Sequence, residues 1–171
     1  MNTDKHLQFI SSKVVDLNVA LFTCQATSLL RLPNSIVYTH KVDENGNIFM
    51  FMPRPKQLIS QFEKEFPVGL NYFKKGKNHF LNIYGKARII NDPEELISYD
   101  LTPAEIDQAL NTDMLIKVKI LKADYYEKDQ AKKNSLLNRA KSFVYSLLAL
   151  VERDERSYDF SGHPTIHGYG F

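Results

Sequence analysis

Cysteine, net charge and long apolar runs are all scarce in this chain of 171 residues. The single cysteine, Cys24, excludes an internal disulfide framework and any zinc site built from several cysteines. It ends the apolar run Val19-Ala20-Leu21-Phe22-Thr23-Cys24, so we expect a small buried core residue there. The formal net charge of +2 is too small to imply a polyanionic partner, and we therefore predict no nucleic-acid partner.

Membrane and export signals are also missing from the sequence. The longest apolar stretch, 143–151, is interrupted by Ser146 and is too short to span a bilayer. The first six residues are polar and contain no apolar signal region. We expect a soluble, cytoplasmic protein without a membrane partner.

No familiar catalytic or metal-binding motif is present. The sequence contains no Ser-His-Asp or Cys-His arrangement, no Walker A loop and no dinucleotide-binding glycine fingerprint. His163 and His167 have the spacing of a helical metal pair, but Pro164 and the nearby glycines argue against a regular helix. We therefore predict no metal site, and we assign no catalytic residue.

Apolar and aromatic residues, in contrast, are abundant and regularly spaced. At 43% hydrophobic and 12% aromatic, the chain can bury a continuous core within one domain. Residues 4–17 have the periodicity of an amphipathic helix. Alternation predicts six strands, at 19–24, 35–42, 48–52, 68–73, 81–89 and 114–120. The predicted fold class is mainly β with flanking helices, in the form of a small antiparallel barrel.

Turns and helix ends are predicted from local chemistry. Asn45-Gly46 supplies the positive φ values of a tight hairpin turn between the second and third strands. Pro55 favours a helix that ends at Pro67, while Asp92 and Thr102 precede two further short helices. Residues 135–151 predict a long final helix, and its second half is apolar nearly all round. We predict no fold for residues 152–171.

The order of these elements resembles a known family. The stretch comprises Pro33 to His40, the Asp43 to Asn47 turn, Ile48 to Met52, Pro53 to Ile59, and Phe80 to Ala87. It is similar to the flavin-binding split barrels related to pyridoxamine 5'-phosphate oxidase, especially the general-stress-protein branch. The resemblance implies a six-stranded antiparallel split β-barrel of the FMN-binding type over 1–130. Residues 131–171 would then form a helix and tail that pack on the barrel or on a partner chain.

The same resemblance implies FMN as cofactor and a homodimer with two FMN sites at the subunit interface. Lys56 matches the family lysine that binds the FMN phosphate, and Arg54 offers a second cation. Ser35 and Ile36 stand where the family usually carries a phosphate-binding arginine. The expected wall beneath the flavin ring consists of Ile36, Val37, Tyr38, Phe51 and Met52. Taken singly, these apolar residues suit core packing equally well, and the two cations suit a solvated turn.

Two functional readings stay open from the sequence. One is an FMN-dependent oxidoreductase of unknown small-molecule substrate. The alternative is a non-enzymatic dimeric barrel that binds another planar ligand, such as haem or coenzyme F420, or no cofactor. A third feature, the mixture of aromatic and basic residues over 72–77, could bind single-stranded nucleic acid by stacking, but the near-neutral charge favours an exposed loop.

Overall fold

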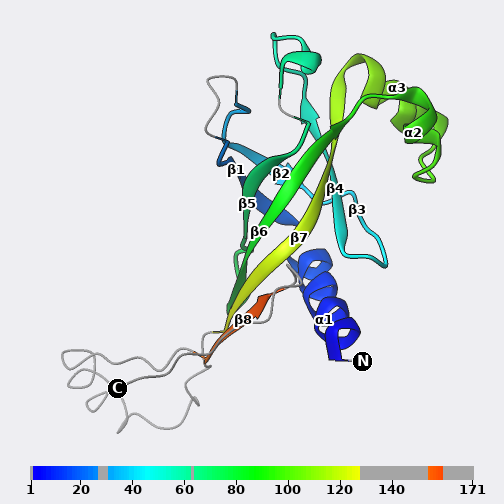
Figure 1. The fold of residues 1–171 in the computed structure, drawn as a ribbon. Coiled ribbons are helices and arrows are strands. Elements are labelled where there is room, and N and C mark those ends of the chain that lie inside the picture. The colour runs from blue at the N-terminus through cyan, green and yellow to red at the C-terminus, as the bar shows by residue number, and fades with distance from the viewer. Residues whose placement is uncertain (1, 27–30, 63, 128–153, 160–171) are drawn as a thin grey trace, which may run out of the picture.

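The computed structural model describes residues 2–26, 31–62, 64–127 and 154–159. Figure 1 shows the elements wound around one barrel, with α1 at one end and α2 and α3 at the other. In chain order the helices and strands are α1 (Asn2–Leu17), β1 (Val19–Cys24), β2 (Ser35–Tyr38), β3 (Lys41–Val42), β4 (Asn47–Pro53), a single 3₁₀ turn (Ile59–Gln61), β5 (Phe66–Tyr72), β6 (His79–Ile90), α2 (Pro93–Ile97), α3 (Pro103–Asn111), β7 (Asp113–Glu127) and β8 (Asp154–Asp159).

The strands form a closed six-stranded antiparallel barrel, as predicted. The hydrogen-bonded order is β2-β1-β5-β6-β7-β4-β3. β2 and β3 together make up the single predicted strand 35–42, which pairs first with β1 and then with β4. This change of partner closes the barrel, because one strand then belongs to both edges of the sheet.

The change of partner occurs at Thr39 and His40. The Thr39 amide donates to the Asn18 carbonyl at 2.9 Å, while the next amide, of His40, donates to the Phe49 carbonyl at 2.8 Å. Asn18 has a φ of +61°, the left-handed conformation that asparagine tolerates better than most residues, directly before β1. Adjacent residues therefore bond to opposite neighbours, and the strand is interrupted here.

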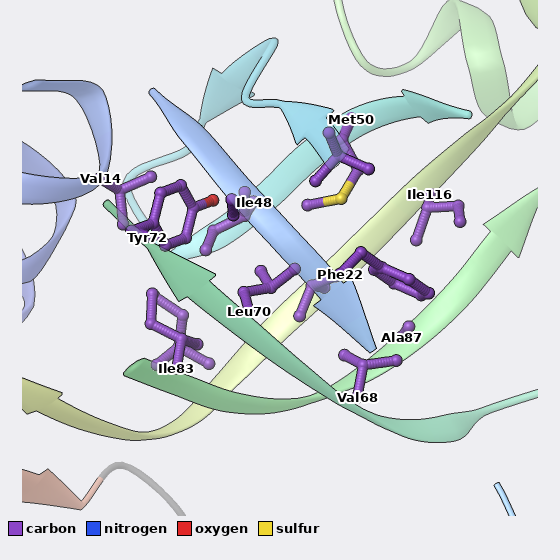
Figure 2. Close-up of a cluster of buried hydrophobic side chains, with 14 of the residues drawn as sticks. Val14, Phe22, Ile48, Met50, Val68, Leu70, Tyr72, Ile83, Ala87 and Ile116 are labelled. Carbon is purple, nitrogen blue, oxygen red and sulfur yellow. The ribbon is translucent and has the colours of Figure 1, made fainter. Parts of the chain in front are cut away.

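The barrel interior is filled by the inward residues that the alternation predicts. Figure 2 shows side chains from β1, β4, β5, β6 and β7 pointing toward one another, with Val14 of α1 beside Tyr72. In α1, Ile10, Val14 and Leu17 are fully buried, so the predicted apolar face covers the barrel end. Burial of such side chains is the main stabilising contribution to the fold.

A second, smaller cluster joins α2 and α3 to the outside of β4, β6 and β7. Its buried members are Phe49, Ile90, Leu96, Ala109 and Leu115. Both helices begin at the predicted caps. The carboxylate of Asp92 accepts from the amides of Glu94 and Glu95, and Thr102 and Glu105 form a reciprocal capping box. The barrel thus carries a small helical lobe on one part of its outer surface.

The helix predicted from Pro55 to Pro67 is wrong. Only the 3₁₀ turn Ile59–Gln61 forms there, and β5 already begins at Phe66, which pairs with Ala87. Pro67 lies inside β5 rather than beyond a helix. It is tolerated at the end of the β1–β5 ladder, where its carbonyl accepts from the Gln25 amide at 2.9 Å and no proline N–H is needed. Tertiary pairing outweighs the local helical pattern of the preceding apolar residues.

Two further details differ from the sequence-based expectation. In the β3–β4 turn only Gly46 has a positive φ, +74°, and Asp43 accepts hydrogen bonds from the amides of Asn45 and Asn47. β8, in the tail for which no fold was predicted, pairs antiparallel with β7. The predicted helix 135–151 lies outside the described residues.

Candidate functional site

A cavity of about 740 Å³ opens where β2 and β4 separate. Its lining comes from the end of β1, the segment before β2, and the segment that ends and follows β4. The lining residues are Thr23, Cys24, Arg31, Leu32, Pro33, Asn34, Pro53, Arg54, Pro55 and Gln57. We call this cavity the split cavity.

The sequence explains why the strands part at this point. β3 and β4 pair only through Lys41 with Phe49 and Val42 with Ile48, and β2 has no register with β4. Pro33, Pro53 and Pro55 lie in the segments that flank the gap, and proline has no backbone N–H to donate to a ladder. Pairing therefore does not extend toward the start of β2, and the space between the strands stays open.

The split cavity is positively charged. Arg31 and Arg54 line it, and none of its ten lining residues is acidic. The Arg54 guanidinium also donates to the Ala109 carbonyl at 2.6 Å, near the end of α3 where the helix dipole favours a cation. Arg54 is thus partly committed to the helical lobe, whereas Arg31 is exposed. The donor set suits an anionic group.

The predicted wall residues divide between the two faces of their strands. Val37 and Met52 are buried in the barrel core, so their side chains cannot also line an outer surface. Ile36 and Tyr38 point outward and are 56% and 65% exposed. Phe51 is half-buried, packs against the helical lobe and lies edge-on to the ring of His40 at 5.2 Å. Strand alternation therefore leaves two of the five as exposed apolar surface.

The predicted phosphate residues are also arranged differently from expectation. Lys56 is exposed and lies between Pro55 and Gln57, which line the split cavity, but it is not itself part of the lining. No α-helix begins there, so no helix N-terminus lies beside Lys56 to add backbone amides. The Ser35 hydroxyl, at the start of β2, donates to the Pro33 carbonyl at 3.3 Å.

Arg31, to which the sequence analysis assigns no role, also lines the split cavity. It lies four positions before Ser35, where the resemblance expects an arginine, and the chain around Pro33 brings it to the split cavity. The only signal in the sequence was its closeness to that position. Irregular backbone around a proline has no periodicity that would predict where such a side chain points.

The basic turn after β5 is held against α1. Lys77 Nζ lies 2.7 Å from the carboxylate of Asp16, and Lys74 donates to the Asp16 carbonyl at 3.3 Å. The hydrogen bond from Lys77 lowers the pKa of Asp16. Tyr72 is buried, so it presents no exposed ring for stacking.

The described residues contain neither a cluster of metal ligands nor a helix that could span a membrane. Among the described residues, no group of three or more His, Cys, Asp and Glu side chains is placed to hold a metal ion. No helix within the described ranges is long and apolar enough to cross a membrane.

The comparison with solved structures agrees with the fold described above. No family model matches the sequence, and no curated protein matches it. Among solved structures, a general stress family protein from Xanthomonas campestris matches with a TM-score of 0.57 at 13% identity, covering 80% of this chain and 95% of its own. The general stress FMN/FAD binding protein from Xanthomonas citri matches with a TM-score of 0.54 at 13% identity, covering 76% and 93%.

A third structure, from Clostridium acetobutylicum, is described as related to general stress protein 26 of Bacillus subtilis and as a member of the pyridoxinephosphate oxidase family. It matches with a TM-score of 0.54 at 13% identity, covering 72% of this chain and 89% of its own. At such identities the likeness concerns the backbone, and it agrees with the resemblance seen in the sequence. The chain therefore has the split-barrel fold of the general stress proteins related to pyridoxamine 5'-phosphate oxidase.

Proposed function

We propose that this protein binds FMN and that the FMN phosphate occupies the split cavity. One observation carries the proposal. The segments before β2 and after β4 line one cavity with two guanidinium groups and no carboxylate, and they adjoin Ser35, Ile36 and Lys56, the positions that the resemblance assigns to the phosphate. Guanidinium groups bind phosphate with paired, charge-assisted hydrogen bonds.

Arg31 is the principal phosphate ligand in this proposal. Its side chain is exposed at the cavity, whereas Arg54 already donates to the Ala109 carbonyl. The Asn34 amide, also in the lining, can add a neutral hydrogen bond, whereas the Thr23 hydroxyl already donates to the Gly69 carbonyl at 3.2 Å. Lys56 would contribute mainly through its charge, because it lies beside the cavity and not in it.

The flavin ring needs apolar surface next to the phosphate site. Ile36 and Tyr38 supply such surface on β2, directly after the segment that carries Asn34. A bound flavin would supply hydride or electron transfer, and the protein would supply placement and exclusion of water. The Xanthomonas citri protein with this fold is described as binding FMN or FAD, which supports flavin as the ligand class. The finer proposal is an oxidoreductase of unknown substrate.

We also propose that the site is completed by a second copy of the chain. Exposed apolar side chains on a sheet face, such as those of Ile36 and Tyr38, are typical of protein interfaces. Sedimentation at micromolar concentration should give a dimer, and Tyr38→Lys should shift it toward monomer. A wild-type monomer would contradict this part of the proposal and leave the phosphate site to be tested separately.

An FMN titration followed by flavin fluorescence tests the phosphate site. Arg31→Gln should weaken FMN about ten- to hundredfold, the value of one charge-assisted contact to phosphate. Lys75→Gln is the matched control, because it also removes one exposed positive charge but lies in the β5–β6 turn. Lys56→Gln should fall between the two. Riboflavin, which lacks the phosphate, should bind all four proteins equally.

Equal losses of FMN affinity in the Arg31 and Lys75 variants would show that the phosphate does not bind in the split cavity. The second candidate would then lead, namely a barrel that binds another planar ligand or none. The specific observation that favours it is Ser35, a neutral residue at the position where the resemblance expects an arginine.

A further inference from the structure

A second cavity lies on the outer surface of the barrel, over β6 and β7 and beside the β3–β4 turn. Its volume is about 740 Å³, within the range of small-molecule sites. Its lining residues are Asn45, Asn47, Glu65, Lys86, Arg88, Lys117, Lys119 and Leu121, and none of them lines the split cavity. We call this cavity the basic groove.

The basic groove has like charges on directly opposed strand positions. Lys86 of β6 is in register with Lys119 of β7, and Arg88 is in register with Lys117. Directly opposed residues on one face have Cβ atoms about 4.5–5.5 Å apart, and like charges in such positions are destabilising. Four cations therefore meet on two adjacent rows of the sheet, at a cost to the free protein.

Two of these cations have an acidic partner. Arg88 bonds to the carboxylate of Glu95, and Lys86 lies 4.0 Å from that of Glu65. Both members of the second pair are more than half exposed, so solvent screens it. Glu65 and Glu95 thus offset part of the positive charge on β6 and leave the positive charge on β7 without an acidic partner.

The two β7 lysines have no such partner. Lys117 donates to the Tyr99 hydroxyl at 3.3 Å, and its ammonium lies over the Tyr99 ring at 5.1 Å. The Tyr99 hydroxyl in turn donates to Glu95 at 2.6 Å. Lys119 is exposed, and within the described ranges neither lysine forms an ion pair with a carboxylate. The contacts of Lys117 hold its charge at the groove without neutralising it.

A β-bulge sets the shape of the groove. The β6–β7 register shifts between Tyr84, which pairs with Lys122, and Gly85, which pairs with Ile120. Leu121 is therefore the extra residue, and it lines the groove. A bulge bends and twists its strand locally. The floor of the groove is thus formed by the β6–β7 ladder, while Asn45 of the β3–β4 turn and Glu65, just before β5, complete its edges.

We propose that the basic groove binds a small molecule that carries two or more phosphate or carboxylate groups. Such a ligand supplies the missing negative charge between Lys86, Lys117 and Lys119, and the cavity is large enough to hold it. Glu65 and Glu95 repel an anionic chain that continues past the groove, and this favours a compact anion over a nucleic-acid backbone. The proposal is independent of FMN, because the two cavities share no lining residue.

Thermal unfolding with inorganic pyrophosphate tests it, at constant ionic strength set with sodium chloride. Without pyrophosphate, Lys119→Gln should unfold at a temperature equal to or above that of the wild type, because it relieves the Lys86–Lys119 repulsion. With pyrophosphate the wild type should unfold at the higher temperature. Calorimetry should show that Lys119→Gln binds pyrophosphate about three- to tenfold more weakly than the wild type. Lys75→Gln, matched in charge, should behave as wild type, and Lys86→Gln should repeat the Lys119 result.

Two outcomes would overturn the proposal. If Arg31→Gln abolishes pyrophosphate binding while Lys119→Gln and Lys75→Gln lower it equally, the anion binds in the split cavity alone. If a single-stranded oligonucleotide binds more tightly than pyrophosphate and loses more affinity in Lys119→Gln, the groove is part of a nucleic-acid surface. Comparing phosphate esters with di- and tricarboxylates then identifies which anionic group the groove prefers.

Discussion

Two seams of the same barrel differ in how completely their strands are paired. β6 and β7 pair along the whole of β6, from His79 to Ile90, whereas β3 and β4 pair only at Lys41 with Phe49 and Val42 with Ile48. At the β6–β7 seam the outer surface carries two opposed pairs of cations, made of three lysines and one arginine. At the β3–β4 seam the strands separate, and two arginines line the space that this leaves. We call the β6–β7 seam the closed seam and the β3–β4 seam the open seam.

The comparison shows two ways in which one fold concentrates positive charge. Along β6 and β7, strand register fixes the cations, so their positions follow from the alternation of the sequence. At the split, cations are brought together because prolines end the pairing and the chain leaves the sheet. The basic groove should therefore be rigid and the split cavity more adaptable.

The largest expected effect comes from breaking the closed seam. A Cβ at Gly85 would lie 2.5 Å from the Lys119 carbonyl oxygen and 2.8 Å from a methyl group of Val118. Because the first of these is backbone, the strands would have to move apart, and Gly85→Ala should lower the free energy of unfolding by about 3 kcal/mol. Chemical denaturation measures it.

Gly76→Ala is the matched control for Gly85→Ala. Gly76 has a φ of +88°, so alanine is strained there, but no atom lies within 4 Å of the added Cβ. Gly76→Ala should lower the free energy of unfolding by about 1 kcal/mol, because of the strained backbone conformation alone. Equal losses at the two glycines would show that close packing at the β6–β7 seam is not what Gly85 provides.

For the closed seam the sequence predicted the core-facing residues, although it ended the last strand at 120 where β7 runs to Glu127, and for the open seam it predicted less. Alternation in β6 and β7 predicted which side chains are buried, and Leu81, Ile83, Met114, Ile116 and Val118 all lie in the core. Position in a strand determines the face, so a period of two residues is enough. The β-bulge at Gly85 was not predicted, because it depends on packing against the partner strand.

At the split, the alternation of the sequence did not give the side-chain directions. The resemblance places Ser35 to Tyr38, Phe51, Met52, Arg54 and Lys56 in one site without separating inward from outward positions. Val37 and Met52 proved to be core residues, and Arg31 reached the cavity from an irregular segment. The predicted helix after Pro55 did not form, and Phe66, the last residue of its apolar face, belongs to β5 instead. Where no ladder or helix imposes a period, the pattern carries little directional information.

Adding a cation at the open seam should have the next largest effect. Ser35→Arg places a guanidinium at the start of β2, where the resemblance expects one, and should tighten FMN about tenfold. The gain should shrink with added salt, because the new contact is partly exposed. Riboflavin should show no gain. An equal improvement for both ligands would indicate altered packing and not a phosphate contact.

The point where the strand changes partners should be sensitive to a smaller change. The hydroxyls of Thr39 and Tyr72 share a hydrogen bond of 2.8 Å inside the barrel end. Tyr72→Phe removes it and should lower the free energy of unfolding by about 1 kcal/mol. Thr39→Val in the same background should cost little more, because its hydroxyl has already lost that partner.

Tyr72 should also make stability depend on alkaline pH. Burial raises the pKa of Tyr72 above its ordinary value, so the native state holds the proton more tightly than the unfolded state does. Its contribution is complete below about pH 10 and decreases above it, as the unfolded tyrosine ionises. The wild type should therefore lose more stability between pH 9 and pH 11 (roughly, around the ordinary tyrosine pKa) than Tyr72→Phe does. Parallel curves would exclude Tyr72 as the source.

The smallest expected effect concerns the helical lobe, which packs beside both seams. Glu105 accepts hydrogen bonds from the backbone amide and the hydroxyl of Thr102, at 2.7 and 2.8 Å. The hydrogen bond from the Thr102 backbone amide is the main reason that the pKa of Glu105 is lowered. A lowered pKa means that its contribution is present at neutral pH and is lost as pH falls through the ordinary carboxyl range, about 4.3, and below. Glu105→Gln keeps an acceptor for the capping box but removes the titration, so at pH 7 it should cost about 0.5 kcal/mol or less. Its stability should fall less steeply than that of the wild type as the solution is acidified. Chemical denaturation across this pH range measures the difference, and Asp107→Asn, which changes an exposed carboxyl on the same helix, serves as the control. If both variants flatten the curve equally, the effect comes from the net charge of α3 and not from its cap.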